Sequence, residues 1–192
     1  MFAYCLNNPV AYGDYTGCDA ILLLDEDNVG HIGIMVQDSE GKWWHFYWGT
    51  DTWWRRTLCA FSISVEPKTW CVEYTGDTSL DAINNSAQYS GDYEKTIYLS
   101  GDFSSCVSKM KNPSGKYNLY SANCAQVSLG ILATAETSYS YCLSQASKNV
   151  LPAFAFLSVK TYIDAERAFD KFNSVVFSVT GAIIGSIWRV VQ

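Results

Sequence analysis

The sequence predicts an α+β fold in which an antiparallel sheet packs against helices and a helical extension follows at the C-terminus. Short runs rich in β-branched and aromatic residues are concentrated between residues 18 and 99. Two of these runs flank a short polar turn, as in a β-hairpin, and the others are suited to complete the same sheet. The last third of the chain instead mixes apolar and charged residues in a helical pattern.

The first strands are expected in the N-terminal half. The run CDAILLL at 18–24 is short and apolar, which is typical of a buried strand. The runs HIGIMVQ at 31–37 and KWWHFYW at 42–48 are both β-prone, and DSEG separates them. We therefore expect these two runs to form a hairpin.

The turn chemistry of this hairpin predicts its register. A type I turn with a left-handed glycine pairs Asp38 with Lys42, which places His45 opposite Met35. His31 then lies on the same face of the sheet as His45. Four residues separate their levels, roughly 13 Å at a rise of ~3.3 Å per residue.

The remaining elements follow from shorter signals. Further strands are expected at 57–65, 69–74 and 95–99, with a polar loop at 76–91. An acidic start and basic end predict a short helix over 102–110.

The C-terminal region is predicted to be helical from residue 153 onward. Its tail, VVFSVTGAIIGSIWRVV, has one charged residue, Arg189. A membrane-spanning helix needs about 20 apolar residues, and this run is interrupted by Ser, Thr and Gly. We expect a core or interface helix, with membrane insertion as the alternative.

Composition excludes several classes of function. The net charge of −6 and the scattered Lys and Arg residues argue against a nucleic-acid partner. The seven cysteines include no C-x-x-C pair, so we expect neither a zinc site nor a disulfide framework, and no cofactor. The start, MFAYCLNNPV, lacks the features of a secretory signal, so any export would depend on residues outside this sequence.

Cys124 is the strongest candidate for a nucleophile. It stands where the polar segment YNLYSAN becomes the apolar, helix-like run CAQVSLGILAT. The N-terminus of a helix stabilises a thiolate. A base is also needed, and the chain has only two histidines, His31 and His45. The other cysteines lie in the N-terminal segment, in strand-like runs or in helical runs, the last two being settings where a buried thiol is expected.

The N-terminal segment FAYCLNNPVAYGDYTG resembles the closing segment of the RHS/YD-repeat core, which joins a repeat shell to a variable C-terminal toxin. The resemblance implies a junction over 1–17. Together with the cysteine and histidine segments and the helical pattern of the last third, it leads us to expect a catalytic domain over 18–152 and a helical extension over 153–192. It also implies a bacterial effector toxin, secreted or delivered within a larger RHS protein. Such a toxin acts inside a target cell or at its envelope, and an immunity protein is an expected partner.

The strings GHIGIMVQDSEGKWWHF and YNLYSANCAQVS together resemble the circularly permuted papain-like fold. Lecithin retinol acyltransferase-like proteins and PPPDE-like peptidases have this order of histidines and cysteine. The resemblance implies that Cys124 is the nucleophile, His31 the base and His45 the orienting residue. Tyr47, nearer the level of His31, is the alternative orienting group.

These observations predict a cysteine hydrolase, or an acyltransferase or transamidase, that forms a thioester with a protein, peptide or lipid acyl substrate. Two alternatives belong to other classes. One is a toxin that inserts its C-terminal apolar helix into membranes. The other is a catalytically inactive binding module with a surface rich in tryptophan. The tryptophans that would form this surface are Trp43, Trp44, Trp48, Trp53 and Trp54.

Overall fold

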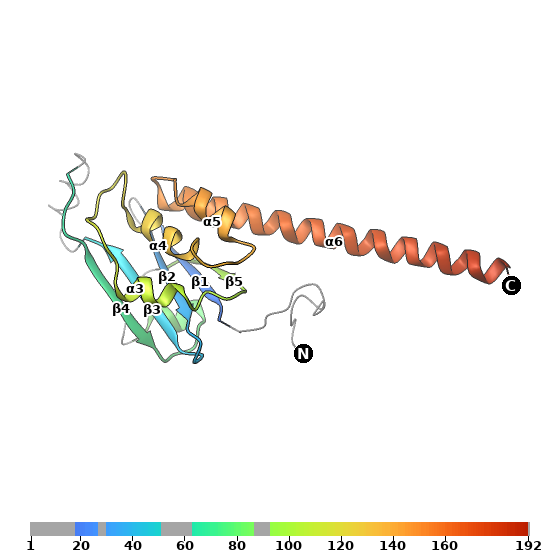
Figure 1. Cartoon of the computed structure of the whole chain (residues 1–192), viewed down its shortest axis with the longest axis horizontal. Coiled ribbons are helices and arrows are strands. Elements are labelled where there is room, and N and C mark those ends of the chain that lie inside the picture. Colours follow the sequence, from blue (N-terminus) through green and yellow to red (C-terminus); the bar gives the residue numbers. More distant parts are fainter. Residues whose placement is uncertain (1–17, 27–29, 51–62, 87–92, 192) are drawn as a thin grey trace. The chain divides into compact units, whose positions relative to one another are not determined.

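The computed structural model describes residues 18–26, 30–50, 63–86 and 93–191, with side chains described as far as residue 173 (Figure 1). The predicted junction at 1–17 lies outside the described residues. The chain divides into two compact units, Met1–Ser158 and Val159–Gln192. The candidate site lies entirely in the first unit.

The first unit is built on one five-stranded sheet with the order β4-β3-β2-β1-β5. All neighbouring strands are antiparallel, as predicted. The strands are β1 (Ala20–Asp25), β2 (His31–Gln37), β3 (Trp43–Gly49), β4 (Lys68–Tyr74) and β5 (Lys95–Leu99). The sheet and the helices that follow it confirm the α+β class.

The hairpin of β2 and β3 has the predicted register. Met35 lies opposite His45, and the Asp38 N–H donates to the Lys42 carbonyl at 2.9 Å. Gly41 has φ +81°, the left-handed conformation that this turn requires. The Asp38 carboxylate also accepts from the indole N–H of Trp44 at 2.8 Å, which joins the turn to β3.

The helices agree less closely with the sequence prediction. They are α2 (Leu80–Asn84), α3 (Cys106–Lys111), α4 (Cys124–Leu132), α5 (Ser140–Ala146) and α6 (Pro152–Val191). The short α2 falls within the segment predicted to be a loop. α3 starts later than predicted because the Asp102 carboxylate accepts from the Ser104 N–H at 3.0 Å and holds a turn there.

One predicted strand is described only at its end. Residues 57–62 lie outside the described part of the chain. Val65 forms an isolated antiparallel bridge with Tyr117, and each donates to the other's carbonyl. This bridge fixes the start of the loop that leads into α4.

The two faces of the sheet are covered by different elements. On the face that we call the α4 face, α4 packs against β2 and β3, and the Trp48 indole donates to the Ala122 carbonyl at 3.0 Å. The opposite face, called here the α2 face, carries an apolar cluster. Its members are Ile21, Leu23, Met35, Tyr74, Ile83 and Tyr93. The central strands β1 and β2 are consequently buried on both sides.

Within the part of the chain that the structure describes, none of the helices has the combination of length and apolar character needed to span a membrane. The side chains of the tail from residue 174 onward lie outside the described ones.

Candidate active site

Asn123 determines where α4 begins. Its backbone is extended, and its side-chain oxygen accepts from the Gln126 N–H at 3.0 Å. The Gln126 side chain accepts in return from the Asn123 N–H at 3.1 Å, which completes a capping box. Cys124 is therefore the first residue of α4, as the sequence predicted.

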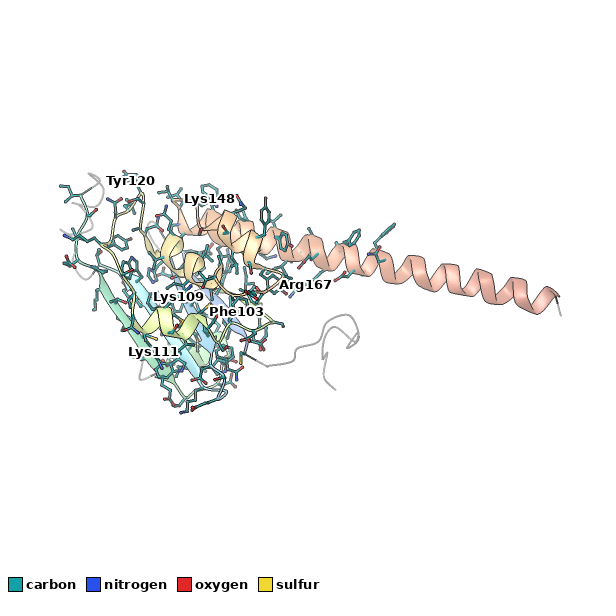
Figure 2. All side chains as sticks on the ribbon, in the orientation of Figure 1. Phe103, Lys109, Lys111, Tyr120, Lys148 and Arg167 are labelled. Atoms are coloured by element: carbon teal, nitrogen blue, oxygen red, sulfur yellow. The ribbon has the colours of Figure 1, made fainter. Side chains whose placement is uncertain are left out.

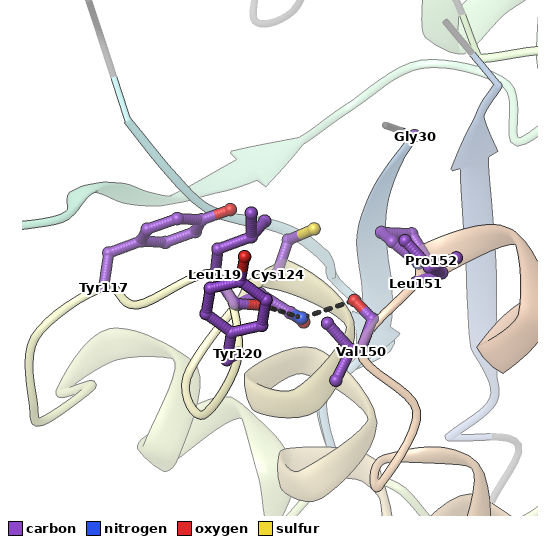
Figure 3. Close-up of a pocket in the computed structure, with 9 residues that line it drawn as sticks. Gly30, Tyr117, Leu119, Tyr120, Cys124, Val150, Leu151 and Pro152 are labelled. Atoms are coloured by element: carbon purple, nitrogen blue, oxygen red, sulfur yellow. Dashed lines mark hydrogen bonds between the residues drawn. The ribbon is translucent and has the colours of Figure 1, made fainter. Parts of the chain in front are cut away.

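Asn123 also joins two segments that are distant in sequence. Its side-chain N–H₂ donates to the Leu119 carbonyl at 2.8 Å and to the Val150 carbonyl at 2.7 Å. The residue is only 1% exposed, so these bonds are made away from water. They hold the loop before α4 and the segment before α6 on either side of Cys124 (Figure 3).

Cys124 contributes to the wall of a cavity of about 190 Å³. Figure 3 shows its sulfur directed toward the side of the cavity formed by Gly30 and Pro152. The cavity is lined by Gly30, Tyr117, Leu119, Tyr120, Asn123, Cys124, Val150, Leu151 and Pro152. Most of this lining is apolar, and it comes from three separate parts of the chain.

Burial dominates the electrostatics of Cys124. It raises the pKa of the thiol to about 11, although the backbone amides of Ile32, Ala125 and Cys124 favour the thiolate. The charge of Asp25 acts in the same direction as burial. The thiol is therefore protonated at neutral pH in this structure, and its chemistry requires a base.

The neighbours of His31 in the chain adjoin the Cys124 site, whereas its own ring packs against another residue. It is the first residue of β2, between Gly30, which lines the cavity, and Ile32, whose amide acts on the sulfur. Its ring packs instead against Tyr47, with centroids 4.4 Å apart, on the α2 face.

His45 is buried in the core of the α2 face. It is 1% exposed, and its Nε2 lies 3.2 Å from the Tyr93 hydroxyl oxygen. Burial lowers its pKa to about 4, so the ring is neutral at physiological pH. The structure thus places His45 apart from Cys124 and gives it the surroundings of a core histidine.

Of the two predicted orienting groups, Tyr47 is the one in contact with His31. Tyr47 also stacks on Trp70, with ring centroids 4.0 Å apart and an interplanar angle of 4°. The three rings therefore form a stack across β2, β3 and β4, which holds His31 away from the α4 face.

Asp25 is a candidate that the sequence analysis did not single out. It lies directly opposite His31 in the β1–β2 ladder, so the two side chains share a face. The sequence does carry a signal for this residue, because Asp25 ends the apolar run AILLLD shortly before the Gly30-His31 pair. The strand expected at 18–24 ends one residue before Asp25.

The other cysteines that the structure describes are not in disulfides and occupy structural positions. The Cys18 thiol donates to the Asp38 carbonyl at 3.4 Å and the Cys106 thiol to the Ile131 carbonyl at 3.2 Å. Burial raises the pKa of Cys71 to about 11. Among the described residues, no group of three or more His, Cys, Asp or Glu side chains is placed to bind a metal ion.

The tryptophans proposed for a binding surface are used within the fold. Trp48 is 1% exposed. The ammonium nitrogen of Lys111 lies over the Trp44 ring, 3.2 Å from the ring centre (Figure 2 labels this lysine). Trp43 packs against the cluster of the α2 face. Trp53 and Trp54 lie outside the described residues.

Comparisons with family models, with curated proteins and with solved structures find no match to this chain.

Proposed function

We propose that this protein is a cysteine-dependent hydrolase or acyltransferase that forms a thioester on Cys124. The observation that carries the proposal is the position of this thiol: it is the first residue of α4 and part of the wall of a cavity. The proposal extends to the circularly permuted papain-like fold, whose order of histidine and cysteine segments the chain resembles.

The proposed reaction has two steps. The Cys124 sulfur loses its proton and attacks the carbonyl carbon of an ester or amide, and the alcohol or amine leaves with that proton. Water or a second nucleophile then breaks the thioester. The amides of Cys124 and Ala125 are at the positive end of α4, where they can donate to the oxyanion.

His31 is the proposed base. The thiol is protonated at neutral pH because burial raises its pKa to about 11, so removal of the proton has to be assisted. His31 follows Gly30, which has φ +78° and lines the cavity. For proton transfer, the His31 ring has to leave Tyr47 and turn around the end of β2, and we propose that substrate binding beside Gly30 favours this movement.

Asp25 is the proposed orienting group. Asp25 pairs with His31 at the end of the β1–β2 ladder, and its charge also acts on the Cys124 thiol, so its carboxylate is placed to stabilise the imidazolium that forms beside the sulfur. His45 has no step in this scheme, since it is neutral and enclosed in the core.

We further propose that the chain is the toxin cargo of an RHS-repeat protein, acting on a target cell and neutralised by an immunity protein. The support for this context is the resemblance of residues 2–17 to the RHS junction.

The thiol chemistry is tested with p-nitrophenyl acetate as a general acyl donor. Wild type is compared with Cys124→Ala and with a matched control, Cys142→Ala, which removes another buried thiol from α5. We expect release of p-nitrophenol above the uncatalysed rate for wild type and Cys142→Ala, and the uncatalysed rate for Cys124→Ala. Equal rates for all three proteins would refute the proposal.

A further inference from the structure

From the walls of the Cys124 cavity we infer that the site selects substrates whose acyl group is neutral, apolar and compact. This inference rests on the proposed function, because it specifies the substrate class of the same site. Among the residues that the structure describes, those lining the cavity carry no charge. An ionised acyl group would lose its water there and find no charged side chain in the wall to pair with, which is strongly unfavourable.

The most polar residue of the wall is already fully engaged by the protein. The Asn123 side chain accepts from Gln126 and donates to Leu119 and Val150. Its hydrogen-bonding groups therefore hold the walls together and are not available to orient a polar substrate. The rest of the lining is the backbone of Gly30, the rings of Tyr117 and Tyr120, and four aliphatic side chains. These four are Leu119, Val150, Leu151 and Pro152, and most of this surface favours apolar contact.

The size of the cavity limits the acyl group. Its volume is about 190 Å³. An apolar protein cavity of roughly 150 Å³ holds one benzene molecule. A branched aliphatic or single aromatic group therefore fits beside the sulfur, whereas a long unbranched chain has to extend beyond the walls.

The residues at the mouth of the cavity also favour an apolar substrate. Tyr120 and Leu151 line the cavity and remain 48% and 45% exposed. Figure 2 shows Tyr120 at the outer surface of the molecule. A substrate entering the cavity therefore first meets aromatic and aliphatic side chains.

The substrate class is tested with p-nitrophenyl esters that share a leaving group. The esters are the isovalerate, the acetate, the decanoate and the negatively charged hydrogen succinate. We expect kcat/KM to be highest for the isovalerate, and higher than for the hydrogen succinate by about tenfold or more, the range that apolar pockets achieve. If thiol-dependent turnover is equal across the series, or fastest for the charged ester, the inference is wrong although the proposed function stands.

One variant of the cavity wall and one matched control test whether the wall determines which substrates are turned over. Leu151→Asp places a charge in the wall, and aspartate is well tolerated just before a helix, so α6 should still begin normally. Leu157→Asp is the matched control, since this leucine is exposed and lies outside the cavity lining. We expect Leu151→Asp to lower kcat/KM for the isovalerate about tenfold and Leu157→Asp to leave it unchanged. Equal effects of the two variants would overturn the assignment.

A binding measurement that involves no turnover distinguishes the inferred substrate class from the proposed reaction. The Cys124→Ala variant is titrated by NMR with isovaleramide and, separately, with succinamate. Saturable shifts with isovaleramide alone support the apolar site even if no ester is turned over, in which case only the proposed function fails. Binding of succinamate as tightly as isovaleramide would contradict the inference.

Discussion

The side chain of Asn123 donates a hydrogen bond to the Val150 carbonyl over 2.7 Å, so the residue that caps α4 also fixes the segment leading into α6. Because Cys124 follows Asn123 directly, one residue sets both the start of the helix and two walls of the cavity. This relationship leads to the first prediction.

Asn123→Ala should lower the free energy of unfolding by about 2 to 4 kcal/mol. The change removes an N-cap, which contributes about 1 kcal/mol, and deprives two carbonyls of their donor at a buried position. Urea denaturation measures the loss. Asn112→Ala is the control, because that amide makes a single exposed bond, to the Ser108 carbonyl at the end of α3. Similar losses in the two variants would show that Asn123 has no special role.

His45 should make the protein less stable in acid. Its pKa is about 4 in the folded protein and 6.5 in the unfolded chain, so the unfolded state binds the proton first as the pH falls. The contribution of neutral His45 is complete above pH 6.5 and is lost between 6.5 and 4. The shift corresponds to about 3 kcal/mol.

Urea denaturation at several pH values tests this prediction. His45→Gln should flatten the stability profile between pH 6.5 and 4, whereas His31→Gln should preserve most of it. A profile of unchanged slope in His45→Gln would mean that this histidine is not the group responsible.

Releasing the His31 ring should increase the reactivity of Cys124. In Tyr47→Leu the ring loses the aromatic surface on which it packs, so it can more readily turn toward the cavity. We expect iodoacetamide to modify Cys124 faster at pH 7.5 in Tyr47→Leu than in wild type, as measured by peptide mass spectrometry. The increase should disappear in the double variant Tyr47→Leu/His31→Ala. An increase that persists without His31 would indicate simple opening of the fold, and no increase at all would count against His31 as the base.

Two glycine substitutions should have opposite effects. Gly41→Ala forces a side chain into a left-handed turn position and should cost about 1 to 2 kcal/mol, although the new methyl group would meet only the Gln37 amide at 3.8 Å. In Gly130→Ala, inside α4, the new methyl group meets no atom within 4 Å apart from its chain neighbours and the helix's own backbone, so the change should stabilise by about 0.5 to 1 kcal/mol. Thermal unfolding of both variants checks the signs, and destabilisation by Gly130→Ala would mean that the space beside α4 is occupied.

The sequence was informative wherever a local rule applied. The turn DSEG with its glycine determined the hairpin register, and the Asn123-Cys124 pair determined the start of α4. The short helix α2 was missed because its five residues, LDAIN, are too few to show a helical period, and it is stabilised mainly by packing Ile83 into the core.

The relation between the histidines and Cys124 could not be predicted in the same way. Alternation along the strands shows that His31 and His45 share a face of the sheet. It shows which face a helix covers only when one face is apolar and the other is polar. Here β2 is buried on both sides, so its pattern gave no indication that α4 would cover the face opposite to the histidines. That choice depends on long-range packing.

The most direct test of the account is to trap the acyl-enzyme. The protein is mixed with p-nitrophenyl isovalerate, quenched in acid within the first turnovers, digested and analysed by mass spectrometry. We predict one isovaleryl group, removable by hydroxylamine, on the peptide that contains Cys124, and none in Cys124→Ala. Accumulation of the acyl group on another residue, or p-nitrophenol release that persists undiminished in Cys124→Ala, would contradict the account.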